Sequence, residues 1–316
     1  MKAIPTSNDV TPPDPAAPIP PEIAAWFAKA GWRVRRHQVE MLAKARAGRD
    51  ALLMADTGAG KTLAGFLPTL CDFAPSAGAV PGDGLHTLYV SPLKALAQDV
   101  KRNLLTPIED IGLPIRVETR SGDTPSNRKK RQRQRPPHVL LTTPESLSLL
   151  LSYPESADLF AGLRRIVIDE VHAFATDKRG DLLALSLARL HALAPQAQRA
   201  ALSATLANPR AFQEWLAPQS ADAEGAIAAA DLVLGEDGAA PEVEILLPVE
   251  ERVPWGGHAG RWAVPQLYEA IKANRTTLVF TNTRFLAEFI FQCLWEENAD
   301  HLPIGIHHGS LSTEAR

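Results

Sequence analysis

This sequence has few cysteines, no long apolar run and almost balanced charge. Cys71 and Cys293 are the only cysteines in 316 residues, which excludes a disulfide framework or a CxxC metal site and fits a reducing cytosol. No apolar run reaches the roughly 18 residues of a membrane span, and no secretory signal begins the chain. The chain has a net charge of −3, so a nucleic acid would have to bind to local basic patches. We expect a cytoplasmic protein.

The order of apolar segments predicts an α/β domain over residues 22–216. Residues 1–21 contain seven prolines and predict a disordered tail. Beyond the tail, short apolar runs alternate with amphipathic helical stretches. These runs are residues 51–54, 87–90, 138–141, 165–168 and 199–202. Apolar strands separated by helices are typical of a parallel sheet covered on both faces.

The remaining residues predict a linker and a second, smaller α/β domain. Residues 217–241 are rich in alanine, glycine and acids, and we interpret them as a linker with one short strand at most. Residues 242–316 are about half a typical domain, so we expect an incomplete sheet. The expected strands are 243–247, 277–281 and 304–307, and the expected helices are 264–273 and 284–297.

The sharpest motif is ADTGAGKT at residues 55–62, between the apolar strand 51–54 and a helix. Its glycines let the backbone turn so that N–H groups face a phosphate, while Lys61 supplies a positive charge and Thr62 a hydroxyl for Mg²⁺. The alternative is a glycine-rich turn that only caps a helix; the order of strand, loop, Gly-Lys-Thr and helix favours ATP binding. The expected nucleotide contacts are Thr57, Gly58, Ala59, Gly60, Lys61 and Thr62.

A second motif is a pair of carboxylates, Asp169 and Glu170, directly after the strand 165–168. Such a pair is usually a solvated turn, but the phosphate loop upstream favours a catalytic role for it. Asp169 would then hold Mg²⁺ together with Thr62, and Glu170 would polarise the attacking water. The predicted cofactors are ATP and Mg²⁺, and the predicted catalytic residues are Glu170, Lys61 and Asp169.

With these motifs the chain resembles the superfamily 2 helicases of the DEAD/DEAH type, because residues 169–172 spell DEVH. The strings SPLKALAQD, SGDTP, TTPESL, VPWGGH, TLVFTNTR and HHGSLS are similar to the Lhr branch, in particular to bacterial ligase-associated helicases of the DNA damage response. The resemblance runs from Trp26 to Arg316. It implies a RecA-like P-loop NTPase domain followed by an incomplete second RecA-like domain.

The resemblance also assigns roles to residues that mean little alone. It implies that Gln38 reads adenine, although a surface glutamine is the plainer interpretation. It implies that His172 links the nucleotide site to Ser203 and Thr205, where a core histidine is the alternative. The strand-binding residues that it implies are Pro92, Lys94, Arg120, Gly122, Asp123, Thr143, Pro144 and Glu145. The prolines among these could simply begin helices, although free N–H groups at helix starts also suit phosphates.

Two functions remain open. The resemblance implies an ATP-dependent nucleic-acid helicase or translocase that acts on DNA in repair. Its expected partners are a single strand or a duplex with a single-stranded tail, RNA as an alternative, and repair proteins such as an ATP-dependent DNA ligase. The alternative is a truncated, catalytically weak fragment that binds ATP and nucleic acid, because no late arginine motif follows residues 307–310.

A basic run at residues 128–135 holds six cations in eight residues. Such a run is usually a solvated helix face. Because it lies between two of the implied strand-binding segments, a contribution to DNA or RNA binding is equally plausible.

Overall fold

The computed structural model describes residues 19–78, 81–174, 177–219, 227–236, 242–246 and 260–311. Side chains at positions 94–96, 98 and 99 are outside the description, as are the predicted tail up to residue 18 and the VPWGGH string. The chain divides into two compact units between residues 238 and 239.

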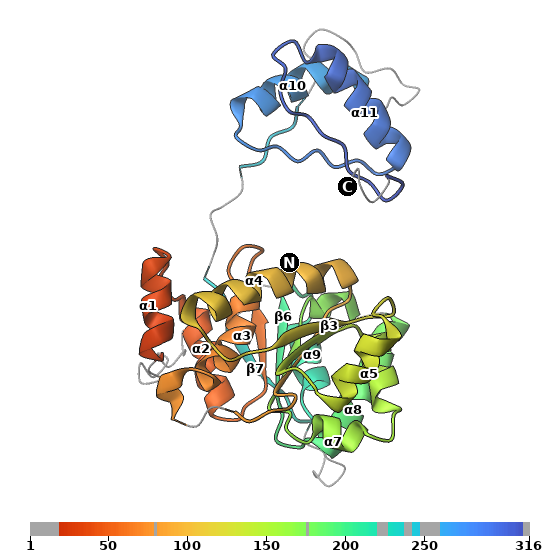
Figure 1. Ribbon diagram of the computed structural model, residues 1–316. Coiled ribbons are helices and arrows are strands. Elements are labelled where there is room, and N and C mark those ends of the chain that lie inside the picture. The colour runs from red at the N-terminus through yellow and green to blue at the C-terminus, as the bar shows by residue number, and fades with distance from the viewer. Residues whose placement is uncertain are drawn as a thin grey trace. The chain divides into compact units, whose positions relative to one another are not determined.

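The first unit is built on a seven-stranded sheet in the order β3-β4-β2-β5-β6-β1-β7, in which all recorded pairs are parallel. The parallel α/β fold is confirmed (Figure 1). The strands are β1 (Ala51–Met54), β2 (Thr87–Val90), β3 (Val117–Arg120), β4 (Val139–Thr142), β5 (Arg165–Ile168), β6 (Gln198–Ser203) and β7 (Asp231–Leu234). Strand β7 lies in the segment interpreted as a linker, yet it pairs with β1 as an edge of this sheet.

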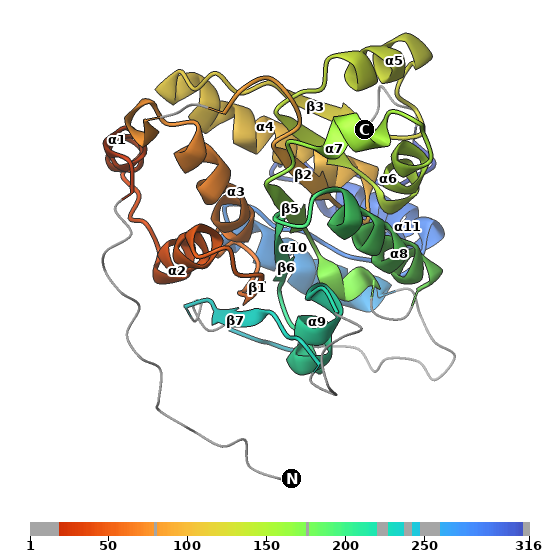
Figure 2. The same cartoon turned by 90° about the horizontal axis from the view of Figure 1, so that it is seen from below.

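Helices cover both faces of the sheet (Figure 2). One face carries α1 (Pro21–Lys29), α2 (Arg36–Arg46), α3 (Lys61–Asp72) and α4 (Lys94–Ile111). The other carries α6 (Pro144–Leu151), α7 (Ser156–Phe160), α8 (Lys178–Leu193) and α9 (Pro209–Leu216), with the short 3₁₀ helix η2 (Val171–Phe174) before α8. Helix α5 (Ser126–Gln134) follows the edge strand β3. No helix in the described ranges is long and apolar enough to cross a membrane.

The inner strands are mostly apolar because each face of the sheet has its own core. Leu53 and Val167 pack with the α1–α4 side, whereas Leu52 and Ile166 pack with the α6–α9 side. Successive strand residues point to opposite faces, so a sheet covered on both faces favours apolar residues at successive positions. This double burial explains why the strands could be predicted as continuous apolar runs.

Parallel pairing brings the ends of all strands to one edge of the sheet. Val90 pairs in register with Thr142, and Thr142 with Arg120. On the other half of the sheet, Met54 pairs with Ser203. The carboxyl edge of an open parallel sheet is where such folds bind ligands. The phosphate loop, the acidic pair and the segments at Pro92 and Thr143–Glu145 follow strands at this edge.

The second unit contains α10 (Val264–Ala273) and α11 (Arg284–Glu297), at the predicted bounds. Its core is a small cluster around Val264, Tyr268, Ile290 and Leu294. The strands predicted at 243–247, 277–281 and 304–307 are wrong for the residues described there, since none of these is in a strand; residue 247 lies outside the description. Strand pairing needs neighbours and a covering layer, and here Phe280 remains 89% exposed.

Candidate active site

The loop after β1 has the backbone geometry of a phosphate cradle. Gly58 and Gly60 have φ angles of 81° and 76°, in the left-handed region that glycine adopts at no steric cost. A Cβ at Gly60 would also lie only 2.9 Å from Gln38 Nε2. Helix α3 starts at Lys61, so the free N–H groups of its first turn are next to the loop. The arrangement suits an anion.

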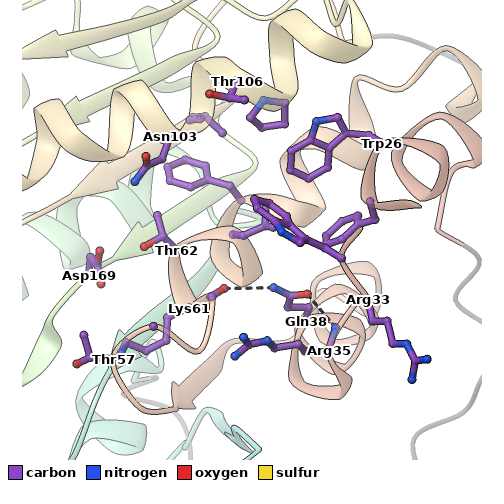
Figure 3. A pocket seen from close by; sticks show the side chains of 18 of the residues that line it. Trp26, Arg33, Arg35, Gln38, Thr57, Lys61, Thr62, Asn103, Thr106 and Asp169 are labelled. Carbon is purple, nitrogen blue, oxygen red and sulfur yellow. Dashed lines mark hydrogen bonds between the residues drawn. The ribbon is translucent and has the colours of Figure 1, made fainter. Parts of the chain in front are cut away.

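Lys61 is folded back onto this loop and is 8% exposed. Its Nζ donates to the carbonyl oxygens of Ala55 at 2.8 Å and Asp56 at 3.1 Å. Both acceptors are neutral, and a phosphate offers the ammonium a stronger, charged acceptor. Figure 3 shows Lys61, Thr62 and Asp169 around the same pocket.

The pocket has a volume of about 830 Å³ and lies within the first unit. Polar and charged residues of the loop and of the segment after β5 line one part, and aromatic side chains of α1 and the following turn line another. These residues are Thr57, Gly58, Gly60, Lys61, Thr62, Asp169, Glu170, Gln38, Trp26, Phe27 and Trp32, among others. A site with phosphate-binding groups at one end and rings at the other suits a nucleotide.

Gln38 lines this pocket and is only 3% exposed, so the alternative of a surface glutamine is wrong. Its Oε1 accepts from the backbone N–H of Arg35 at 2.9 Å, and its Nε2 donates to Gly60 O at 3.4 Å. The amide therefore links helix α2 to the phosphate loop (Figure 3). Its reading of adenine stays a prediction.

The neighbouring His37 was not predicted as a site residue. It is completely buried, and its Nε2 lies 2.9 Å from the carbonyl oxygen of Ala59. Since a carbonyl can only accept, Nε2 carries the proton. Burial lowers the pKa of His37 despite the opposing hydrogen bond to Ala59, so the ring is held neutral. The signal in the sequence was its place directly before Gln38.

The carboxylate of Asp169 is held on both oxygens. The hydroxyl of Tyr89 donates to Oδ2 at 2.5 Å, and the backbone N–H of Glu170 donates to Oδ1 at 2.9 Å. Burial, together with the Asp169 charge, raises the pKa of Tyr89, which keeps its proton in place for this bond. Sequence reasoning missed Tyr89, whose only signal was a hydroxyl in an otherwise apolar strand.

Glu170, His172 and Ser203 form a chain across the ends of β5 and β6. Glu170 adopts a φ of 48°, which a residue with a Cβ takes up at some cost and which clusters at functional sites. Its Oε2 lies 3.3 Å from His172 Nδ1, which lies 3.0 Å from Ser203 Oγ. Ser203 Oγ in turn donates to Thr205 O at 3.4 Å. The His172 side chain is 46% exposed, so the core-histidine alternative is wrong; coupling stays a prediction.

The implied strand-binding residues follow β2, β3 and β4, at the same edge of the sheet. The implied role of Arg120 in binding a nucleic-acid strand is corrected, because this residue is only 1% exposed. Its guanidinium donates to Lys129 O at 3.0 Å and to Gln132 Oε1 at 3.4 Å. A cation buried in this way fixes helix α5 to β3 and is not available to a nucleic-acid strand. Gly122 also contacts α5, since its carbonyl accepts from Lys129 Nζ at 2.7 Å.

Helix α6 starts with the segment Thr143–Glu145 directly after β4. Thr143 is buried, and Pro144 occupies the first helical position, where its missing N–H costs nothing. The carboxylate of Glu145 is bound by Arg179 of α8. Glu145 is therefore committed to a protein partner in this structure, which sequence reasoning did not foresee.

The fold and this site define a nucleotide-binding protein with a phosphate loop and an acidic pair at the carboxyl edge of a parallel sheet. The pattern of the DEAD/DEAH box helicases matches residues 35–212, more than half of the chain, and the chain belongs to this family.

Curated and solved relatives extend the match to the Lhr branch. The chain is 34% identical to an ATP-dependent helicase Lhr-Core of Methanothermobacter thermautotrophicus over 94% of this chain and 36% of that protein. It is 36% identical to an Lhr helicase/probable uracil glycosylase of Mycolicibacterium smegmatis over 90% of this chain and 19% of that protein. The solved structure of the Mycobacterium smegmatis helicase Lhr bound to ssDNA and AMP-PNP matches with a TM-score of 0.75 and 34% identity, over 95% of this chain and 39% of that one. The chain thus spans about a third or less of these curated relatives.

Proposed function

We propose that this chain carries the ATP-binding and ATP-hydrolysing site of an Lhr-type helicase or translocase. The observation that carries the proposal is the convergence of Lys61, Thr62 and the Asp169–Glu170 pair on one pocket. Support comes from relatives named as ATP-dependent helicases and from the AMP-PNP bound by the Lhr structure.

Magnesium fits the residues at this site. The Thr62 hydroxyl and the Asp169 carboxylate are oxygen donors beside the phosphate cradle, and Mg²⁺ in such sites binds one or two protein oxygens plus phosphates and water. When bound, it would neutralise charge on the phosphates. Tyr89 holds Asp169 in orientation through its hydrogen bond. These contacts support Thr62 and Asp169 as the residues that hold the ion.

The protein groups then have separate tasks in hydrolysis. Lys61 exchanges its loop carbonyls for phosphate oxygens. Glu170 orients a water molecule and accepts its proton, the step that needs a base. His172 lies between Glu170 and Ser203 and is placed to pass changes at the nucleotide to β6.

We also propose that a single DNA strand binds over the segments that follow β2 and β4. Pro92 precedes α4 and Pro144 begins α6, and helix starts offer free N–H groups to phosphates. The Lhr relative was solved with ssDNA; RNA remains the alternative ligand. A cytoplasmic role in DNA repair beside an ATP-dependent ligase is the finer proposal, and it rests on the sequence resemblance.

ATP turnover with and without nucleic acid tests the proposed function. The purified chain should bind ATP, and single-stranded DNA should raise its hydrolysis more than RNA or blunt duplex does, with Lys61→Ala as the contamination control. Binding without turnover would favour the weak binding fragment. Failure to bind ATP would overturn both.

Helix α5 and the residue that follows it carry the six cations of the basic run, of which Lys129 and Arg133 are half-buried and the other four are exposed. Arg128 and Arg131 are paired with Glu118, at 3.5 and 2.7 Å. Lys130 and Arg135 are exposed, and among the residues that the structure describes their side chains have no hydrogen-bond or ion-pair partner. These two are the cations most available to a phosphate backbone.

Replacing Lys130 and Arg135 together by glutamine should weaken single-strand binding for every sequence tested. Each lost phosphate contact should also lower the slope of log affinity against log salt by about 0.7. Fluorescence titration over a salt series measures both quantities. The matched control is Lys29→Gln with Arg210→Gln, which removes two other exposed cations. Equal loss in both pairs would contradict a specific role for α5.

A further inference from the structure

Arg179, in the first turn of helix α8, joins two of the segments proposed to bind the strand. Its guanidinium binds both carboxylate oxygens of Glu145, in the first turn of α6. The same group donates from Nη2 to the carbonyl oxygen of Pro92 at 2.8 Å. One side chain therefore spans the connection between β2 and α4 and the start of α6.

The start of α8 is itself fixed against η2, the turn that follows the acidic pair. A Cβ at Gly180 would lie 2.0 Å from the carbonyl oxygen of Phe174, so only glycine permits this approach. Asp177 caps the helix by accepting from the Arg179 N–H at 3.4 Å. The backbone of Arg179 is thus held at a set place relative to His172, which lies in η2.

The pair with Glu145 is better suited to fixing geometry than to adding stability. The side chains are 33% and 52% exposed, and exposed ion pairs contribute about 0–1 kcal/mol. Two parallel bonds from a planar guanidinium nevertheless fix distance and direction together, which lysine cannot do. Burial opposes ionisation of Glu145, but hydrogen bonds from Arg179 and the backbone outweigh it and lower its pKa.

We propose that Arg179 is a positioning residue that sets the spacing between the strand-binding segments at Pro92 and at Thr143–Glu145, and that Glu145 serves as its anchor. This inference rests on the proposed function. A bare carboxylate at Glu145 would repel a phosphate backbone, whereas a paired one is neutralised in place. The start of α8 packs against η2, which follows Asp169 and Glu170. The contacts of Arg179 therefore connect both strand-binding segments to the part of the chain that follows the acidic pair.

Helix α8 offers a matched control in Arg189. Its Nη2 donates at 2.7 Å to the carbonyl oxygen of Leu151, at the other end of α6. Arg179 and Arg189 thus join the same two helices, Arg179 through the carboxylate of Glu145 and Arg189 through a backbone carbonyl. Only Arg179 also contacts the segments at the carboxyl edge of the sheet.

The test compares Arg179→Gln, Arg179→Lys, Glu145→Gln and Arg189→Gln in the full chain. We expect Arg179→Gln to raise the single-stranded DNA concentration needed for half-maximal binding and for half-maximal ATPase stimulation by about tenfold, within the range of residues that modulate coupling between sites. Arg179→Lys should recover little of the loss. ATP affinity without DNA should be unchanged, and Arg189→Gln should leave DNA binding unchanged.

Two further measurements separate positioning from other roles. In a double-mutant cycle, Arg179→Gln should add little to Glu145→Gln, because the two residues act as one unit. The salt slope of DNA binding should stay as in the wild type; a fall of about 0.7 would show that Arg179 itself contacts a phosphate and would overturn the inference. Equal DNA affinity in Arg179→Gln and Arg189→Gln would overturn it as well. Lack of DNA binding by the wild-type chain would overturn the proposed function and this inference with it.

Discussion

The Lys61→Ala variant is expected to lose ATP binding almost completely. Lys61 is the only cation in the loop at residues 55–62, and it lies beside the free N–H groups of α3. Alanine at this position leaves the negative charge of the phosphate without a partner in the loop. A loss of about 100-fold or more in affinity, equal to about 2.8 kcal/mol or more, is expected. Titration with a fluorescent ATP analogue measures it.

The control for that variant is Lys29→Ala, which removes an exposed lysine at the end of α1 and should not change ATP affinity. Thermal unfolding should show that Lys61→Ala remains folded, because the hydrogen bonds of the Lys61 ammonium within the described part of the chain go to loop carbonyls. Unchanged affinity in folded Lys61→Ala would remove the phosphate-loop assignment.

The Glu170→Gln variant is expected to bind ATP normally and to lose turnover by a factor on the order of 10² or more. Glutamine keeps the size of the side chain and can still contact His172, but it cannot take a proton from water. The bond to Asp169 Oδ1 comes from the backbone N–H of Glu170, so the metal-binding carboxylate should keep its orientation. Single-turnover hydrolysis and ATP titration measure the two effects separately.

Glu109 on α4, an exposed glutamate that is not among the residues lining the pocket, provides the Glu→Gln control. Turnover at the wild-type level in Glu170→Gln would show that another group activates the water. Equal loss of ATP affinity and turnover would instead show that Glu170 supports binding of the nucleotide.

The sequence predicted the first unit well where burial on both faces makes strands apolar. Strands β1, β2 and β5 lie at the predicted bounds. Strand β3 was missed because an edge strand reading Val-Glu-Thr-Arg has a single apolar residue. In the second unit the residues Thr277–Thr281 have strand composition, but composition cannot say whether a neighbouring strand is there to pair with them.

The site residues divide in the same way. Lys61, Thr62 and Asp169 could be predicted because each belongs to a short motif whose spacing reflects local geometry. Tyr89 and Arg179 could not, since their partners Asp169 and Glu145 lie 80 and 34 residues away along the chain. Arg120 was misplaced for a related reason: nothing local shows that helix α5 covers it.

Strand β2 belongs to both halves of the carboxyl edge. Its Tyr89 holds Asp169, which directly follows the neighbouring β5, and the segment after β2 carries Pro92, which Arg179 contacts. A change in β2 would therefore disturb the response to nucleotide and to nucleic acid at once. In variants selected for a new nucleic-acid preference with unchanged ATP hydrolysis, substitutions should accumulate in α5 and at the start of α6. A substitution there affects the binding of nucleic acid alone.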